Sequence, residues 1–227
     1  MKKAKSKKII SILSIITIIT LLIVPMASCE HTPWDCPGCG RTGNTGNYCG
    51  GCAHPAPWMT VSDSEVCQFG HGNTQDDKLE WIVLDTQDDK ILLISKYILT
   101  YYTYSGIDTF MNTFYINTHF YTSERASILD TVLENGKTCK LFLLSSDEFF
   151  KYFPDDASRI CKPLPSVKED AIESSRYWWL RSPGTKSNTM AVVSGNGTIT
   201  SKDPATNRGV RPAMWITLDA FQGLKAQ

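Results

Sequence analysis

The stretch EWIVLDTQDDKILLIS, residues 80–95, decides how the main part of this 227-residue chain begins to fold. It contains two apolar runs, Glu80–Asp85 and Lys90–Ser95, and the polar sequence TQDD joins them. Two short apolar runs separated by such a polar turn predict a β-hairpin. We therefore expect the main domain, which starts near Val66, to open with paired strands.

Two helical patterns follow the hairpin. Residues 108–129, DTFMNTFYINTHFYTSERASIL, are rich in aromatic residues at helical spacing, with Phe110 and Phe114 on one face. A second short helix is expected to begin at residue 122 or 123, where Glu124 is favourable at the positive helix end.

A buried strand is expected next, in residues 139–145, CKLFLLS. Ser145 and Glu148 have the spacing of a capping box, the reciprocal side-chain and backbone hydrogen bonds that begin many helices. We therefore expect this strand to run directly into a helix.

The last third of the chain has strand-like patterns. RYWWLRS, TMAVVSG, TITS and GVRPAMWITL predict strands within residues 176–182, 189–195, 198–201 and 209–218. The pair Asn196-Gly197 is a strong signal for the tight turn of a hairpin. Strands at both ends of the domain with helices between them indicate the α+β fold class rather than alternating βαβ units.

The first 28 residues have the layout of an export signal. Residues 1–8 hold five lysines and no acid, residues 9–24 are uncharged and mostly apolar, and small residues precede Cys29. The tail MASC resembles a bacterial lipobox, which implies lipidation of Cys29. An uncleaved anchor and ordinary cleaved secretion are the alternatives. We expect an extracytoplasmic protein, anchored to the bacterial cell membrane by an N-terminal lipid or helix.

The charge of the remaining chain bears on its partners. Without the five N-terminal lysines, 18 basic and 23 acidic residues remain from Cys29 onward, a net charge of −5. Binding to phosphate backbones needs clustered Lys and Arg. The composition therefore argues against nucleic acid as a partner.

Four cysteines lie in residues 30–64, a segment too poor in aliphatic residues to build a core. They form two C-x2-C pairs with glycine beside three of the thiols: Cys36, Cys39, Cys49 and Cys52. Four thiolates fill the coordination sphere of a structural Zn²⁺ and leave no open position for water. Two disulfides are the alternative outside the cell. The motif resembles the zinc-ribbon family and is also similar to the Ran-binding-protein type of zinc finger.

Three further cysteines, Cys67, Cys139 and Cys161, lie in the main domain. The apolar neighbours of Cys139 favour a buried small hydrophobic residue. A Cys139–Cys161 disulfide is the alternative. No catalytic residue is assigned among these thiols.

YWWLRSPG and NRGVRPAMW are the most distinctive segments of the main domain. On a strand, Trp179 and Arg181 would share one face and Trp178 would lie on the other. The alternating residues from Gly209 to Trp215, which include Arg211, would likewise share a face. If the two strands are neighbours, the arginines lie over tryptophan rings or pair with buried carboxylates.

That arrangement has a structural and a functional interpretation. In the first, which we favour, the arginines lock the sheet and fix its register. In the second, the surface binds a ligand through residues of the late strands and their loops: Trp178, Trp179, Arg181, Asn196, Arg208 and Arg211. The loops expected to carry this surface are Lys186–Asn188, Gly195–Gly197 and Lys202–Arg208.

Residues 65–222 resemble an uncharacterised bacterial domain family marked by the motifs WWLRSPG and GVRPA. The family is similar to the C-type-lectin-like fold, in the branch that contains formylglycine-generating enzymes and the variable tropism proteins of retroelements. This resemblance implies a mixed sheet with short helices behind a signal peptide or zinc ribbon. The enzymes of that branch use a C-terminal cysteine pair, whereas this chain has no cysteine after Cys161. The Glu-Pro-Asn and Trp-Asn-Asp motifs of calcium-dependent lectins are also absent.

Three functions are consistent with these patterns. We favour a non-catalytic, membrane-tethered binding or adhesion module for an unknown glycan or protein ligand. An enzyme of the formylglycine-generating type or a cell-wall hydrolase would instead use carboxylates such as Asp147, Glu148, Asp155 or Asp156. The third possibility is a structural part of a surface assembly.

Overall fold

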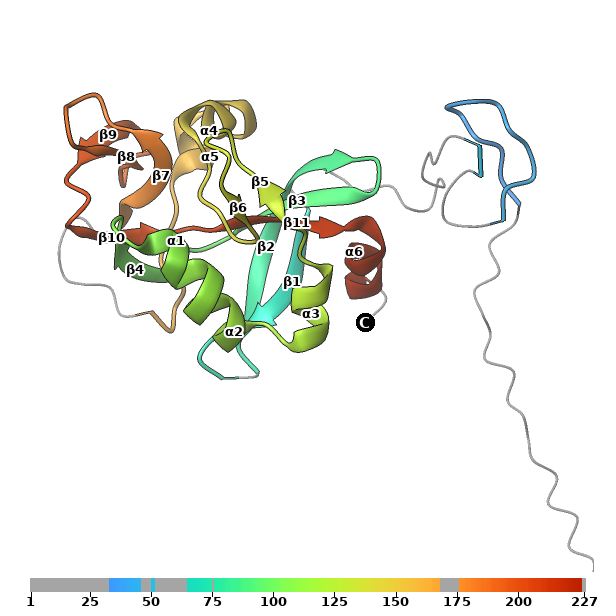
Figure 1. The fold of residues 1–227 in the computed structure, drawn as a ribbon, viewed down its shortest axis with the longest axis horizontal. Helices are drawn as coiled ribbons and strands as arrows, with labels where there is room; N and C mark the ends of the chain where they lie inside the picture. Colours follow the sequence, from blue (N-terminus) through green and yellow to red (C-terminus); the bar gives the residue numbers. More distant parts are fainter. Residues whose placement is uncertain (1–32, 46–49, 52–64, 75, 168–175, 226–227) are drawn as a thin grey trace, which may run out of the picture. The chain divides into compact units, whose positions relative to one another are not determined.

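The computed structural model of the chain describes residues 33–45, 50–51, 65–74, 76–167 and 176–225 (Figure 1). The predicted leader, the lipidation residue Cys29 and the thiols Cys49 and Cys52 lie outside these residues. None of the helices in the described part is long and apolar enough to cross a membrane.

The predicted hairpin is confirmed and lies at the centre of a four-stranded antiparallel sheet. Strand β2 (Lys78–Gln87) pairs with β3 (Lys90–Ser95), and β1 (Val66–His71) and β11 (Ala213–Thr217) complete the order β1-β2-β3-β11. The turn between β2 and β3 holds Asp88 at a φ of 35°. Aspartate is among the few non-glycine residues enriched at positive φ, so the TQDD sequence suits the turn.

A second sheet has five strands and is mixed. Its members, in the order β4-β10-β7-β8-β9, are β4 (Thr100–Thr103), β10 (Asn207–Val210), β7 (Trp178–Pro183), β8 (Met190–Val193) and β9 (Ile199–Lys202). β10 and β7 run parallel, and the other neighbours run antiparallel. The predicted hairpin between β8 and β9 is confirmed, and Gly197 lies in its turn at a φ of 87°.

The single strand predicted over residues 209–218 is wrong, because the chain changes sheet within it. β10 ends at Val210 in the five-stranded sheet, and β11 begins at Ala213 in the four-stranded sheet. Pro212, between them, has no backbone N–H to donate to a continuous ladder. The residues from Gly209 to Trp215 that were expected to share one face are therefore divided between two sheets.

The connection from β3 to β4 changes sheet beside this crossing. Ser95 donates its N–H to the Pro212 carbonyl at 2.9 Å, and Leu99 donates to the Val210 carbonyl at 3.0 Å. Since β3 pairs with β11 and β4 pairs with β10, two antiparallel chain segments pass from one sheet into the other side by side.

The helix predicted over the aromatic stretch is confirmed, and its centre is a π-helix. It consists of α1 (Ile107–Thr109), the π-helix η2 (Phe110–Tyr115) and α2 (Ile116–His119). The Ile116 N–H donates to the Met111 carbonyl, five residues back, which is the π-helical pattern. Phe110 and Phe114 stack on one face as expected, with ring centroids 5.7 Å apart.

The two predicted helix starts that follow are also confirmed. Helix α3 (Thr122–Ser127) begins where expected, and Glu124 accepts the Tyr121 N–H at 2.7 Å. Helix α4 (Ser146–Tyr152) has the predicted capping box: Ser145 Oγ accepts the Glu148 N–H at 3.1 Å, and Glu148 Oε2 accepts the Ser145 N–H at 2.9 Å. Two helices were not predicted as such, α5 (Asp156–Arg159) and the C-terminal α6 (Leu218–Lys225).

Residues 139–145 are buried as expected, but the prediction of a continuous strand there is wrong. The segment contributes only to the short pair β5 (Thr131–Val132) and β6 (Thr138–Cys139), and to a bridge between Phe142 and Ala213. The Asn112 side chain replaces a strand partner: its Oδ1 accepts the Leu141 N–H at 2.9 Å and its Nδ2 donates to the Leu141 carbonyl at 2.8 Å.

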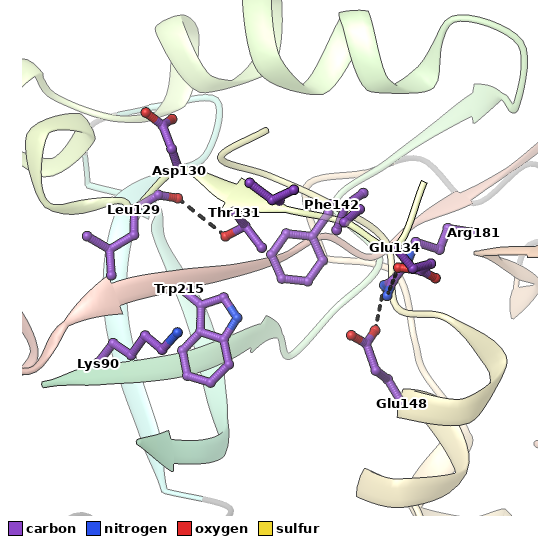
Figure 2. Close-up of a pocket in the computed structure, with 11 residues that line it drawn as sticks. Lys90, Leu129, Asp130, Thr131, Glu134, Phe142, Glu148, Arg181 and Trp215 are labelled. Carbon is purple, nitrogen blue, oxygen red and sulfur yellow. Dashed lines mark hydrogen bonds and ion pairs between the residues drawn. The ribbon is translucent and has the colours of Figure 1, made fainter. Parts of the chain in front are cut away.

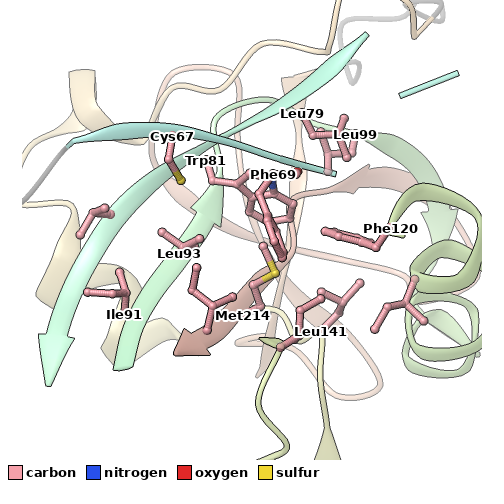
Figure 3. Packing of buried hydrophobic residues seen from close by; sticks show 14 of the residues in the cluster. Cys67, Phe69, Leu79, Trp81, Ile91, Leu93, Leu99, Phe120, Leu141 and Met214 are labelled. Atoms are coloured by element: carbon pink, nitrogen blue, oxygen red, sulfur yellow. The ribbon is translucent and has the colours of Figure 1, made fainter. Parts of the chain in front are cut away.

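The core consists of two apolar clusters. One contains Trp81, Phe120, Met214 and Trp179, and Figure 3 shows how the first three of these pack together. The other contains Trp178 with residues such as Phe149 and Leu180. Consecutive residues on a strand point to opposite faces, so the WW pair of β7 contributes one ring to each cluster. The predicted α+β class is confirmed: the body combines sheets with short helices.

Residues 33–45 and 50–51 include a small turn. Trp34 and Asn44 pair in an antiparallel bridge, and Cys36 and Cys39 lie in the loop between them. A Cβ added to Gly51 would lie 3.6 Å from Cys39 Sγ. Within the described residues no group of three or more His, Cys, Asp or Glu could hold a metal ion, but two of the four motif thiols lie outside them. The choice between zinc and disulfides therefore stays a prediction.

Candidate ligand-binding cleft at Arg181

Side chains from both sheets and from α4 surround a cleft of about 330 Å³ (Figure 2). It is lined by Lys90, Leu129, Asp130, Thr131, Val132, Leu133, Glu134, Phe142, Glu148, Arg181 and Trp215. The volume lies at the lower end of the range of small-molecule sites, roughly 300–1,000 Å³. Charged side chains are frequent in this lining, so the cleft suits a polar ligand.

Arg181 on β7 holds two carboxylates at the cleft. Its Nη1 donates to Glu148 Oε2 at 2.5 Å and to the Leu143 carbonyl at 2.7 Å. Its Nε and Nη2 donate to the Glu134 carboxylate at 2.8 to 3.1 Å. These charge-assisted hydrogen bonds use most of the guanidinium's donors, so Arg181 mainly positions the two acids.

The two carboxylates keep part of their capacity to accept hydrogen bonds. The side chain of Glu134 is 62% exposed and that of Glu148 is 31% exposed. The hydrogen bonds from Arg181 hold the pKa of Glu134 below its usual value, so this carboxylate stays ionised in mild acid. Each carboxylate has about four lone-pair positions, so both can accept a further donor from a ligand.

Trp215 provides an aromatic face in the same cleft. The ring is partly buried, and Lys90 Nζ lies 4.6 Å from its centroid, a cation–π geometry. Trp215 comes from β11 and Lys90 from the paired strand β3. The direct partner of Trp215 is Leu92, and Lys90 lies two positions from Leu92, on the same face of the sheet. The cleft thus combines an indole face, an ammonium group and carboxylates.

Of the predicted ligand-binding residues, only Arg181 lines this cleft. Trp178 and Trp179 are both 0% exposed, so their rings belong to the core. Arg211 is 2% exposed, with its guanidinium 4.9 Å from the Trp178 ring and 5.0 Å from the Phe153 ring. The expectation was that the arginines lie over tryptophan rings or pair with buried carboxylates. Arg211 lies over Trp178, and Arg181 pairs with carboxylates that are partly exposed.

Asn196 and Arg208 lie away from the cleft and make local contacts. Asn196 Oδ1 accepts from the Thr198 backbone and hydroxyl within the β8–β9 turn. Arg208 Nη1 donates to the carbonyl of its neighbour Asn207 at 2.6 Å. Neither residue lines the Arg181 cleft.

The three loops expected to form one ligand surface are not brought together. β8 pairs antiparallel with both β7 and β9. The loops at 186–188 and 202–208 therefore lie at one end of β8, and the turn at 195–197 lies at the other. Four strand residues separate the two ends by about 13 Å, so a ligand would have to span the sheet.

The candidate acids and thiols have mostly structural surroundings. Asp155 accepts the Ser158 N–H at 2.9 Å as the cap of α5, Asp156 pairs with Arg159 at 2.7 Å, and Asp147 is exposed. Cys67, Cys139 and Cys161 are buried free thiols, so the Cys139–Cys161 disulfide is not formed. Burial raises the pKa of Cys67 to about 12, which makes its thiolate scarce at neutral pH.

Sequence reasoning missed Lys90, Glu134 and Trp215 as site residues. Arg181 and Glu134 are 47 positions apart in the chain, and no local motif signals their ion pair. The only available signal was an arginine in an aromatic strand, which predicted a carboxylate partner without identifying it.

Two comparisons with known proteins found no relative, and one found a family. Residues 88–218, more than half of the chain, match the model of a family described as a domain of unknown function (DUF6273). No curated protein and no solved structure matches the chain. The family match begins in the β2–β3 turn and ends at the first residue of α6, so it includes every residue that lines the Arg181 cleft.

Proposed function

This chain belongs to the DUF6273 family of domains of unknown function, and we propose that it is an extracytoplasmic, membrane-tethered binding module. We propose further that the Arg181 cleft receives a glycan or a similar polyhydroxylated ligand. The observation that supports this most is the combination of a partly exposed indole face with ion-paired carboxylates in one cleft of about 330 Å³.

The chemistry of a sugar suits this combination. A hydroxyl group both donates and accepts, and the cleft offers acceptors on Glu134, Glu148 and Asp130 and a donor on Lys90. The C–H face of a sugar ring is apolar and can cover the Trp215 ring, as amphipathic aromatic side chains commonly allow. The acids are already held by Arg181, so a ligand would not have to order them.

A glycan array probed with the full chain in detergent tests the ligand class, with titration calorimetry on any hit. Lys90→Met and Glu134→Gln should each weaken binding about tenfold, since each removes one charge-assisted hydrogen bond. Lys78→Met and Asp147→Asn are matched controls at exposed positions outside the cleft and should leave the affinity unchanged. No hit, or equal affinity in all four variants, would refute a glycan site here.

The tether is supported by the sequence of residues 1–29 and requires its own test. The proposal predicts that labelled palmitate attaches at Cys29 in bacterial cells and that Cys29→Ala abolishes the label. An unlabelled chain in the soluble cytoplasmic fraction would contradict both the anchor and the compartment.

Two finer structural features are also proposed: a C-type-lectin-like architecture for the body and a zinc ribbon before it. For zinc, the support is the spacing of Cys36, Cys39, Cys49 and Cys52 and the proximity of Gly51 to Cys39 Sγ. The full chain should then contain one zinc ion by elemental analysis, and Cys36→Ser should lose it. Thiols that resist alkylation until a reductant is added would indicate disulfides instead.

A further inference from the structure

A second hollow, of about 350 Å³, lies beside the π-helix and differs from the Arg181 cleft in its chemistry. Its apolar wall comes from Leu99, Leu164, Phe110 and Phe114, and its polar side chains include Tyr115 and His119. Among the described residues that line it, none carries a formal charge with histidine neutral. A charged ligand would find no partner there, so the hollow suits an uncharged one.

The hydrogen bonds of His119 define its tautomer. Nδ1 lies 3.0 Å from the His71 carbonyl oxygen and 3.2 Å from that of Gly72. Carbonyl oxygens only accept, so Nδ1 carries the proton, and Nε2 of the neutral ring keeps its lone pair. Burial lowers the pKa of His119, which favours this neutral form. The ring therefore offers the hollow a hydrogen-bond acceptor.

Tyr115 offers the complementary donor. It lies four residues before His119 on the same helical segment, and the two ring centroids are 4.2 Å apart. Burial, followed by the nearby Asp77 charge, raises the pKa of Tyr115, so its hydroxyl stays protonated. Within the described residues neither Tyr115 Oη nor His119 Nε2 has a hydrogen-bond partner.

These two atoms are not sealed in the core. Fully buried side-chain polar atoms that lack a hydrogen bond within the described part of the chain belong to Arg208, Arg211 and Gln222. Tyr115 Oη and His119 Nε2 are not among them, and both side chains line the hollow. A donor and an acceptor, on rings whose centroids are 4.2 Å apart, therefore belong to the lining of a largely apolar space, which is the usual composition of a small-molecule site.

We propose that this hollow is a second binding site, for an uncharged cyclic ligand with a donor and an acceptor on one edge, of the cyclic amide class. The ligand N–H donates to His119 Nε2, its carbonyl accepts from Tyr115 Oη–H, and its ring packs against Phe110 and the two leucines. The π-helix is consistent with such a role, since π-helical turns occur frequently at functional sites. This site does not depend on the glycan proposal.

Ligand-observed NMR with the full chain in detergent tests the site, with 2-pyridone as the probe. N-methyl-2-pyridone, which lacks the donor, should bind about threefold to tenfold more weakly, the value of one neutral hydrogen bond. Tyr115→Phe removes only the hydroxyl and should lower the affinity for 2-pyridone by a similar factor. Tyr121→Phe is the matched control, because Tyr121 does not line the hollow.

The outcomes separate this site from the Arg181 cleft. Glu134→Gln should leave 2-pyridone binding unchanged, and Tyr115→Phe should leave any glycan affinity unchanged. A thermal melt of Tyr115→Phe close to that of the unaltered chain shows that the variant is folded. No saturation transfer to 2-pyridone, or equal binding of both pyridones, would overturn the proposal.

Discussion

The Arg181 cleft and the hollow at His119 have nearly equal volumes, about 330 and 350 Å³, but opposite chemistry. In the cleft, ionised groups are held in place by one another, and Arg181 bridges acids from two different parts of the chain. In the hollow, two backbone carbonyls hold the His119 ring at Nδ1, whereas His119 Nε2 and Tyr115 Oη have no hydrogen-bond partner among the residues that the structure describes. Two pockets of nearly equal volume thus differ in the polar groups that remain available to a ligand.

The largest effect is expected from breaking the ion pairs of the cleft. Arg181→Met leaves Glu134, Glu148 and the Leu143 carbonyl without their donor. Removing one partner of a partly buried ion pair should lower the free energy of unfolding by about 3 kcal/mol, near the low end of the usual range because Glu134 is largely exposed. Chemical denaturation measures this change.

Arg211→Met is the matched control for that experiment. Arg211 is buried between aromatic rings, has no carboxylate partner among the described residues, and has an Nη1 without a hydrogen bond. Methionine removes an uncompensated charge at the cost of one hydrogen bond to the Ser95 carbonyl, so stability should change by less than about 1 kcal/mol. Equal losses in the two variants would show that the ion pairs of Arg181 contribute nothing specific.

Acid should affect the two regions in different pH windows. The pKa of His119 is lowered by burial, so its stabilising neutral form is complete above its usual pKa, about 6.5, and is lost as the pH falls below it. The pKa of Glu134 is lowered by Arg181, so its contribution is complete above about 4.3 and is lost only at lower pH.

Denaturation midpoints measured against pH check this order. His119→Gln should reduce the loss of stability in the upper pH window, and Glu134→Gln should reduce it in the lower window. The rings of His71 and Tyr115 lie close to that of His119, so His71→Gln is a control for the loss of a neighbouring ring. A single step that neither His119→Gln nor Glu134→Gln alters would contradict the assignment.

The smallest effect concerns the wall of the hollow. Phe114 is 61% exposed and stacks on Phe110 from outside. Phe114→Ala should change the free energy of unfolding by no more than about 0.5 kcal/mol, as at most surface positions. The substitution should nevertheless lower the affinity for 2-pyridone severalfold, because it removes apolar contact area. Unchanged binding would exclude Phe114 from the site.

Local features of the fold were predictable from the sequence, and contacts between distant segments were not. The hairpin at TQDD and the capping box of Ser145 and Glu148 depend on neighbouring residues, and both are confirmed. The prediction of one strand over residues 209–218 is wrong because the two halves of this segment join different sheets. Asn112 likewise gave no local sign that it would bind the backbone of Leu141.

The candidate sites follow the same rule. Alternation along β7 correctly divides Trp178 from Trp179, but it does not reveal that both rings are fully buried. Arg181 was identified, whereas Glu134 was not, because only the folded chain brings them together. The loops of the late strands are close in sequence. The antiparallel pairing of β8 with β7 and β9 nevertheless places them at opposite ends of β8.

The paired crossing of β3–β4 and β10–β11 has a mechanical consequence. The two sheets are joined by a ribbon whose backbone hydrogen bonds continue from one sheet to the other at Ser95 and Leu99. Neither sheet can therefore separate from the other without breaking ladder bonds in the middle of the protein. Hydrogen exchange at the centres of β3 and β10 should proceed at the same free energy of opening, as in one cooperative unit.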